Sequence, residues 1–269
     1  MHTFYYSETT MLNSIKMATA YWPTIEKAFK ENMPVIIPLG AGCKEHGHHL
    51  PMNTDFILAE YLADWIFNQY QVIIAPTLQD SFFPAFEEYP GSSTLSLETA
   101  RNIIVEKCVG WHKQGASQFY VLNTGISTNK PLIAASQILN DRGIKFNFFN
   151  FSQIDENPKI KAITQQKVGT HADEIETSIM LYIKPEVVKV SEAKPEECPD
   201  KPGALTRDIT STDKTISVTG AWGNPTLATV EKGVIAIEVI KDILGKELES
   251  LYFKKTSSDL RNDTAKLMK

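Results

Sequence analysis

The sequence has few cysteines and no long hydrophobic run. Its 269 residues include three cysteines, Cys43, Cys108 and Cys198, and their odd number and wide spacing argue against a disulfide framework and a cysteine zinc site. A run of roughly 18 apolar residues, the length that spans a bilayer, is absent. The N-terminal segment also lacks the basic stretch and clean apolar core of a secretion signal. We therefore expect free thiols in a cytoplasmic protein that does not insert into a membrane.

Positive charge and nucleotide-binding motifs are also scarce. The formal net charge is −5, and no run of Lys or Arg forms a basic stripe, so we expect no nucleic-acid partner. The sequence contains no phosphate-binding Gly-rich loop, no dinucleotide fingerprint and no serine elbow flanked by glycines. Nucleotide-dependent chemistry is therefore disfavoured.

The composition is that of a globular protein. Hydrophobic residues make up 42% of the chain and charged residues 22%, which is enough to bury a sizeable core. No Pro/Ser-rich or low-complexity linker interrupts the middle of the chain. We predict a single domain over residues 1–269, with its core at about 34–245 and a polar tail at about 256–269.

Short apolar strands alternate with helices along the chain. The segment 33–40, "MPVIIPLG", is apolar, β-branched and closed by Gly40, which is typical of a buried strand. The segment 54–70 repeats apolar residues at helical spacing, with Thr54 or Asp55 available as its N-cap. Strands are predicted at 33–40, 71–78, 117–125 and 144–151, helices at 54–70, 97–114, 131–143, 170–185 and 225–248, and an irregular excursion at 192–219. This order predicts an α/β fold whose mainly parallel sheet has helices on both faces and a site beyond the carboxyl ends of its strands.

The stretch "KEHGHHLPMNTD", residues 44–55, follows the first predicted strand and holds three of the six histidines. Imidazole and carboxylate together suit zinc, manganese or iron better than calcium. The alternative is a polar loop, because loop histidines are commonly solvated and the aspartate can cap the next helix. Composition and position leave both interpretations open for Glu45, His46, His48, His49 and Asp55.

Two later segments hold further polar candidates. In "HADEIETS", His171 stands just ahead of a predicted helix whose first turn carries three carboxylates, Asp173, Glu174 and Glu176. The helix dipole stabilises carboxylates at that place whether or not they are catalytic. "VLNTGISTN" leaves a buried strand through Asn123 and forms either a ligand-binding turn or only a tight connection.

Four segments, in order along the chain, resemble the creatininase (creatinine amidohydrolase) family. "EHGHHLPMNTD" nearly reproduces the family signature Glu-x-His-Gly-x-His-Leu-Pro-x-x-Thr-Asp. "YPGSSTLS" is similar to a Pro-Gly-Thr segment, "HADEIETSIML" to His-Ala-Gly-Glu-x-Glu-Thr-Ser, and "GNPTLATVEKG" follows in its turn. The resemblance spans roughly residues 34–245. It implies a three-layer α/β/α sandwich with a mainly parallel sheet, assembled into a homo-oligomer that is often a hexamer.

The resemblance also implies a chemistry. Members typically hold two divalent metals and activate a water that opens a cyclic amide or cleaves a related carbon–nitrogen bond. Carried over by position, His46 and Asp55 match metal ligands, with the aspartate bridging the two ions. His171 matches a catalytic histidine that passes a proton to the leaving nitrogen, and Glu176 matches an essential carboxylate near the metals.

Two departures from the family pattern concern the metal ligands. Two residues before His46, where the family has a glutamate ligand, this chain has Lys44, with Glu45 next to the histidine. We predict that a bulge swings Glu45 into the ligand position, because a charged lysine cannot ligate; the alternative is that Lys44 occupies the cation's place. The family's next ligand segment corresponds to "NTGISTN", which has neither histidine nor carboxylate.

The function predicted from these residues is metal-dependent hydrolysis of a small cyclic amide or formamide, using one or two zinc, manganese or iron ions. The alternative is a catalytically impaired binding or scaffold protein that has lost part of the metal site. Metal-dependent lyase or isomerase chemistry is compatible with the same residues. The predicted set is Glu45, His46 and Asp55 as metal ligands, His171 and Glu176 as catalytic residues, and His48, His49, Asn123 and Glu174 as candidates to support or replace a ligand.

Overall fold

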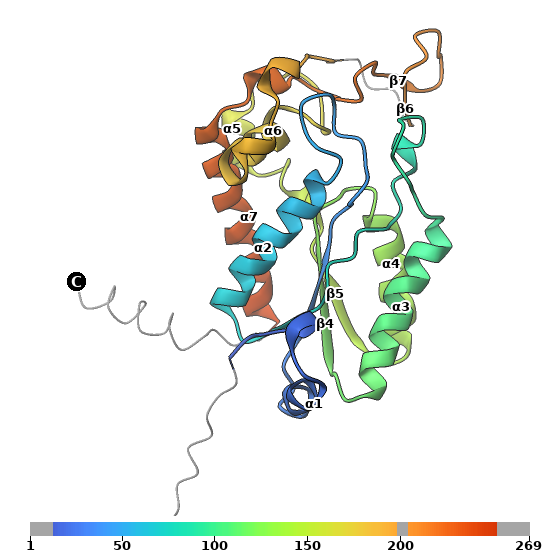
Figure 1. Cartoon of the computed structure of the whole chain (residues 1–269), viewed down its shortest axis with the longest axis vertical. Helices are drawn as coiled ribbons and strands as arrows, with labels where there is room; N and C mark the ends of the chain where they lie inside the picture. The colour runs from blue at the N-terminus through green and yellow to red at the C-terminus, as the bar shows by residue number, and fades with distance from the viewer. Residues whose placement is uncertain (1–12, 198–203, 252–269) are drawn as a thin grey trace, which may run out of the picture.

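The central sheet is parallel throughout. The computed structural model describes residues 13–197 and 204–251, and within them five strands pair in the order β1-β3-β2-β4-β5 (Figure 1). The central strand β2 pairs with β4 from Val35 opposite Phe119 to Leu39 opposite Asn123. The strands are β1 (Ile15–Lys16), β2 (Val35–Leu39), β3 (Ile73–Ile74), β4 (Gln118–Asn123) and β5 (Lys145–Phe148).

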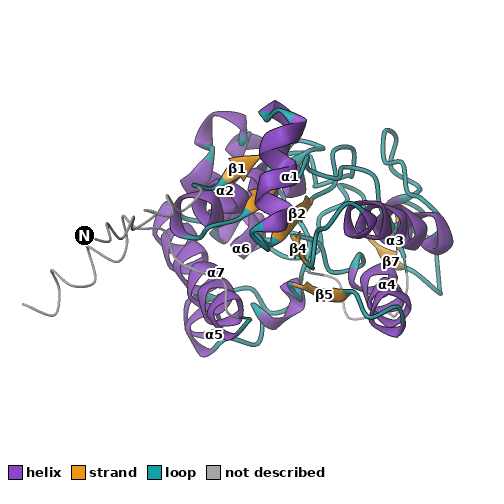
Figure 2. Ribbon diagram, turned by 90° about the horizontal axis from the view of Figure 1, so that it is seen from below, coloured by secondary structure: helices purple, strands orange, loops and turns teal. Residues whose placement is uncertain are grey.

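Helices cover both faces of this sheet, which confirms the predicted α/β/α layers (Figure 2). Along β4, Tyr120 and Leu122 join the core under α2, α6 and α7, while Phe119 and Val121 join the core under α1, α3 and α4. This alternation follows from the strand, whose successive side chains point to opposite faces. The helices are α1 (Trp22–Lys30), α2 (Thr54–Gln69), α3 (Leu97–Lys113), α4 (Asn129–Asp141), α5 (Pro158–Ile163), α6 (Glu174–Ile183) and α7 (Val230–Ser250).

Several elements differ from the sequence-based prediction. The strand expected at 71–78 is continuous only at β3, because Pro76, which has no N–H to donate, interrupts it, and Leu78 then forms an isolated parallel bridge with Leu39. The described residues of 192–219 are irregular apart from the paired strands β6 (Leu205–Thr206) and β7 (Thr215–Ile216) and an isolated bridge from Glu196 to Gly223. β1, α1 and α5 were not predicted. The polar tail at 256–269 and Cys198 lie outside the described residues, within which no helix is both long and apolar enough to cross a bilayer.

Helix α2 begins without a side-chain cap. Asn53 stands at the N-cap position, and its side chain accepts no hydrogen bond from the helix. Asp55 lies inside the first turn, where its carboxylate contacts Lys44 and His46 instead. The prediction that Thr54 or Asp55 caps this helix is therefore wrong, and the carboxylate belongs to the polar cluster described below.

The start of α2 packs against the ends of two strands. β2 lies between β3 and β4, so the carboxyl ends of β2 and β4 form the topological switch point, where open α/β sheets bind ligands. Gly40 follows β2, and a Cβ on it would overlap the backbone of Asp55. Thr124 follows β4 and donates its hydroxyl to the carbonyls of Leu39 and Asp55, at 3.1 and 2.9 Å. These contacts place the first turn of α2 at the switch point.

Candidate metal centre

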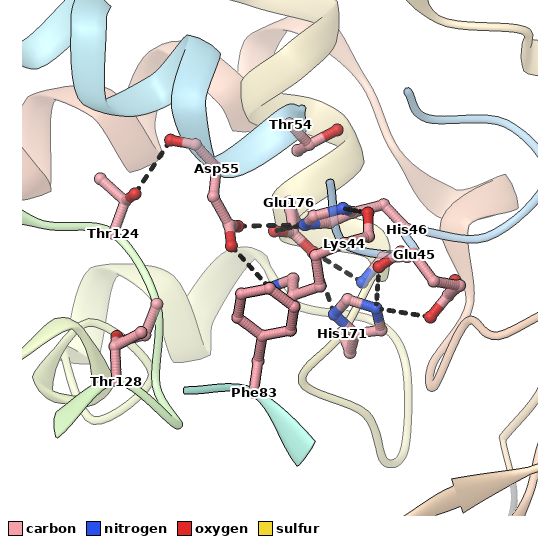
Figure 3. A network of polar contacts seen from close by, with 12 residues as sticks. Lys44, Glu45, His46, Thr54, Asp55, Phe83, Thr124, Thr128, His171 and Glu176 are labelled. Atoms are coloured by element: carbon pink, nitrogen blue, oxygen red, sulfur yellow. Dashed lines mark hydrogen bonds and ion pairs between the residues drawn. The ribbon is translucent and has the colours of Figure 1, made fainter. Parts of the chain in front are cut away.

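A polar cluster forms where the loop after β2, the first turn of α2 and the start of α6 meet (Figure 3). The chain segments are distant in sequence, but their side chains face one another inside the protein. The most exposed of these side chains, Glu176, keeps 21% of its surface accessible. The cluster consists of Lys44, Glu45, His46, Asp55, His171 and Glu176.

His46 is fully buried, and both of its ring nitrogens contact oxygen atoms. Its Nδ1 lies 2.9 Å from the backbone carbonyl of Lys44, and because a carbonyl only accepts hydrogen bonds, Nδ1 carries a hydrogen. Its Nε2 lies 3.0 Å from Oδ1 of Asp55 and 3.6 Å from Oε1 of Glu176. Carboxylate oxygens also only accept, so Nε2 faces them either as a second donor or as a ligand of a cation.

His171 is arranged in a similar way. Its Nε2 lies 2.9 Å from the carbonyl of Glu45 and 3.1 Å from Oε2 of the same residue, which assigns a hydrogen to Nε2. Its Nδ1 lies 3.8 Å from Oε2 of Glu176, an oxygen that accepts a hydrogen bond from the N–H of Ala172 at 2.6 Å. Burial would lower the pKa of His171, but the Glu45 carboxylate outweighs it and raises the pKa.

Three of these residues fit one divalent cation. One nitrogen of His46, one of His171 and one carboxylate oxygen of Glu176 lie within 4.8 Å of one another. Two histidines and a glutamate form a recurrent zinc-binding set that keeps a position open for water. In both histidines the remaining nitrogen is hydrogen-bonded to a protein oxygen, as in most metal-bound histidines. The donors therefore fit a divalent transition metal.

A lysine, and not a glutamate, lies beside Asp55. Nζ of Lys44 is 2.6 Å from Oδ2 of Asp55, and the two side chains are 7% and 4% exposed. Burial would lower the pKa of Lys44, but Asp55 and the carboxylates of Glu176 and Glu45 raise it above its ordinary value. Against its own burial, the pKa of Asp55 is held well below its usual range by Lys44. The pair is therefore ionic.

Glu45 turns to the opposite side of the cluster. Its carboxylate lies beside His171 and accepts a hydrogen bond from the N–H of Gly47. Gly220 leaves room for it, since a Cβ there would overlap the carboxylate. Burial would raise the pKa of Glu45, but His171 lowers it below its ordinary value. This geometry supports the alternative in which Lys44 takes the cation's place, rather than the bulge that would swing Glu45 into the ligand position.

The other candidates, which come from the stretch 44–55 and from the segment after β4, do not belong to the group of three possible metal ligands. His49 is buried, and its Nε2 lies 2.8 Å from Oγ1 of Thr177. His48 is exposed on the loop surface. Asn123 donates to the carbonyl of Gly125 at 2.8 Å and so closes the turn after β4. These residues shape the surroundings of the cluster.

Glu174 faces away from the cluster. Its carboxylate accepts hydrogen bonds from the backbone N–H groups of Gln165 and Gln166, and it forms an ion pair with Lys232 of α7. The sequence-based prediction that Glu174 could replace a metal ligand does not agree with this position. The residue instead fastens the first turn of α6 to α7 and to the preceding loop.

A cavity of about 350 Å³ opens beside the cluster. Lys44, His171 and Glu176 form part of its polar wall, together with Lys130 and Asp155. The remaining lining is mostly apolar and includes Leu58, Phe86, Ile126, Phe151, Ile175 and Trp222. The cavity gives a small molecule with an apolar part access to the metal-binding group.

Nothing in the sequence singles out Phe86 or Trp222 as part of the site. The Phe86 ring lies 4.3 Å from the His171 ring, and Trp222 exchanges backbone hydrogen bonds with His171 at 2.7 and 3.2 Å. Ser92 of "YPGSSTLS" accepts the N–H of Glu45 at 2.9 Å. The signal that could have found them is their position beside two segments of the family resemblance, "YPGSSTLS" and "GNPTLATVEKG".

Comparisons with known proteins agree with the fold. The family model described as "Creatininase: Creatinine amidohydrolase" matches residues 18–248. A curated relative, the mycofactocin precursor peptide peptidase of Mycolicibacterium smegmatis (strain ATCC 700084 / mc(2)155), is 24% identical over 205 residues, covering 74% of this chain and 77% of that protein. The solved structure "Creatininase Mn" has a TM-score of 0.74 at 19% identity and covers 88% of this chain and 98% of its own. A mutant creatininase of "Zn-Zn type" has a TM-score of 0.74 at 18% identity, covering 89% and 98%.

Proposed function

Because the chain belongs to the creatininase family, we propose that it hydrolyses a carbon–nitrogen bond of an amide with a bound divalent metal. The observation that carries the proposal is the group of His46, His171 and Glu176, whose ligand atoms lie within 4.8 Å of one another. Zinc, manganese and iron are the metals that this donor set suits. The names of two structural neighbours, "Creatininase Mn" and "Zn-Zn type", refer to two of them.

His46, His171 and Glu176 would hold the ion, which would supply Lewis-acid activation of a water for hydrolysis. The residues of the chain hold the ligands in place. The Lys44 carbonyl accepts from Nδ1 of His46, Glu45 accepts from Nε2 of His171, and the N–H of Ala172 donates to Glu176. In this assignment His171 and Glu176 are ligands, whereas the family resemblance implies that they are catalytic residues beside the metals.

We propose a small cyclic amide or a formamide as the substrate. The cavity of about 350 Å³ has room for such a molecule with an apolar group attached. Lys44 lines this cavity and can donate a hydrogen bond to a substrate oxygen. Because the name of the curated relative refers to a peptide, short peptides belong in the same substrate panel.

The test combines metal analysis with turnover. Purified protein is dialysed, its metal content is measured, and a panel of lactams, formamides and short peptides is offered with and without a chelator. We expect bound transition metal, chelator-sensitive turnover of at least one compound, and recovery with zinc, manganese or iron. His46→Ala should lose both metal and turnover, because it removes one of three ligands.

The matched control for this test is His48→Ala, which changes an exposed histidine two positions away. It should keep both metal and turnover. Protein that holds no transition metal, together with a His46→Ala variant identical to wild type in stability and activity, would rule out the proposal.

A second candidate is a binding or scaffold protein that does not catalyse hydrolysis. The observation that favours it is the Lys44 ammonium on Asp55, 2.6 Å from its Oδ2, in a chain whose "NTGISTN" segment supplies no metal ligand. Turnover of any panel compound that a chelator abolishes and a divalent metal restores would exclude this candidate.

We also propose a homo-oligomer, as the family resemblance implies, with a hexamer as the expected form and a cytoplasmic location. Exposed aromatic side chains at the start of α1 support an interface, because Tyr21 and Trp22 keep 83% and 75% of their surface accessible. Light scattering on a sizing column would test it, and a monomer at micromolar concentration would contradict it.

A further inference from the structure

We propose that the Lys44 ammonium is a built-in cation that takes the place of a second metal ion, so that each chain binds one divalent ion. The inference rests on the proposed metal-dependent function and specifies how many ions that function uses. It concerns the two oxygens of the Asp55 carboxylate, which face different partners.

The two oxygens of Asp55 are divided between a histidine and a lysine. Oδ1 lies 3.0 Å from Nε2 of His46, the nitrogen that belongs to the proposed ligand group. Oδ2 lies 2.6 Å from Nζ of Lys44. A carboxylate that bridges two cations presents one oxygen to each, and here the ammonium is the cation at Oδ2 (Figure 3).

The backbone and the surrounding rings keep the ammonium in this place. The N–H of Lys44 donates to the carbonyl of Met52 at 3.0 Å, and its own carbonyl accepts from the His46 ring at 2.9 Å. The ring of Phe86 covers the side chain, with its centroid 5.0 Å from Nζ. Since the side chain of Lys44 is only 7% exposed, solvent screens its charge weakly.

No ligand side chain from the β4 exit reaches Oδ2. A Cβ on Gly125 would lie 3.9 Å from this oxygen, so position 125 points a side chain towards it. The residue there is glycine, in the segment "NTGISTN" that lacks histidine and carboxylate. A divalent ion at Oδ2 would therefore find one carboxylate oxygen and a repelling ammonium.

The charges of the cluster agree with a single ion. Three carboxylates, those of Glu45, Asp55 and Glu176, face one ammonium, that of Lys44. Two negative charges remain when both histidines are neutral, as metal ligands must be. One divalent ion neutralises them, whereas a second would leave excess positive charge in a buried site.

Zinc content measures this directly. Wild-type protein, Lys44→Arg and Lys44→Glu are loaded with excess zinc chloride, desalted and analysed by mass spectrometry for zinc per chain. We expect one zinc in wild type and in Lys44→Arg, which keeps the charge. Lys44→Glu should hold two, because it removes the ammonium and places a carboxylate beside Asp55.

Circular dichroism shows whether Lys44→Glu folds, and a second variant tests the inference if it does not. Lys44→Met removes the charge without adding another, and it should bind zinc about tenfold more tightly than wild type in competition with a chromophoric chelator. Lys130→Met is the matched control, since Lys130 also lines the cavity but is exposed; its zinc affinity should stay at the wild-type value.

The outcomes separate this inference from the proposed function. Two zinc ions in wild type would overturn the inference, and so would wild-type zinc content in Lys44→Glu or wild-type affinity in Lys44→Met. No zinc in wild type with one in Lys44→Glu would overturn the metal-dependent function and the single bound ion, and would support only the part of the inference in which Lys44 replaces a cation.

Discussion

The attraction between Lys44 and Asp55 offsets the free energy that each charged side chain loses when it is removed from water. Both side chains are almost completely buried, and their charged atoms lie 2.6 Å apart. Removing one partner of a buried ion pair leaves an uncompensated charge, which costs far more than the pair contributes when both partners are present. The two residues should therefore show strong coupling in stability measurements.

Asp55→Asn should lower the free energy of unfolding by about 3 kcal/mol, because it leaves the buried Lys44 ammonium without the carboxylate that pairs with it. Urea unfolding followed by circular dichroism measures the loss. The double variant Lys44→Met/Asp55→Leu removes both charges and should lose less than Asp55→Asn alone. A double variant as unstable as the sum of its single changes would contradict the coupling.

His49 should make stability depend on pH. Burial lowers its pKa from 6.5 to about 4, so between these values the unfolded chain binds a proton that the folded protein does not. The stability that the neutral His49 contributes is complete above the unfolded-state pKa. It is lost progressively as the pH falls from the unfolded-state pKa to the folded-state pKa. The free energy of unfolding should fall by up to about 3 kcal/mol across this interval.

The variants His49→Gln and His48→Gln isolate this effect. His49→Gln removes the titrating ring, so its free energy of unfolding should change less with pH over the same interval than that of wild type. His48→Gln changes the exposed neighbour and should keep the wild-type dependence. Equal pH dependence in wild type and His49→Gln would refute the assignment.

At the scale of elements, the first turn of α6 is held on two sides. Asp173 caps the helix and accepts from the N–H of Glu176 at 3.0 Å. Glu174, fully buried, binds backbone N–H groups of the preceding loop and pairs with Lys232 of α7. Because this turn carries Glu176, the contacts between α6 and α7 also position the proposed metal ligands.

Lys232→Met should lower the free energy of unfolding by about 3 kcal/mol, because it leaves Glu174 buried without its cation. Lys246→Met in the same helix is the control. Lys246 pairs with Asp242 at 2.7 Å, but the two side chains are 74% and 55% exposed, so its loss should be under about 0.5 kcal/mol. Similar losses in both variants, measured by urea unfolding, would contradict this account.

Local patterns identified most of the elements but not all of them. α2 and α7 were predictable because apolar residues recur at helical spacing over a long stretch. α1 was not, because it buries only Ala28 and Phe29 and so leaves a sparse pattern. β1 was not, because only two of its residues pair in the ladder and so short a strand has no period to detect; β3 was predicted, as the strand at 71–78, but it is shorter than expected.

At the scale of the whole molecule, the site lies at the topological switch point of the sheet, where strands are added on opposite sides of β2. β2 continues to β3 on one side and is paired with β4 on the other, and α2 begins beside the carboxyl end of β2 (Figure 1). The α/β class and the parallel sheet followed from the alternation of strands and helices, and both are confirmed. The single domain over 1–269 and the hexamer stay predictions.

The order of most elements, the family and the stretch that contains His46 and Asp55 could be predicted from the chain alone, because they depend on local periodicity and on motifs of consecutive residues. The contacts that these residues make depend on how the chain folds. His171 and Glu176 meet His46 across a long sequence separation, and the ammonium of Lys44, rather than the carboxylate of Glu45, lies against Asp55. Neighbouring residues on a loop point to different sides, and which side faces a given carboxylate depends on the packing of α2 and α6 around the end of β2.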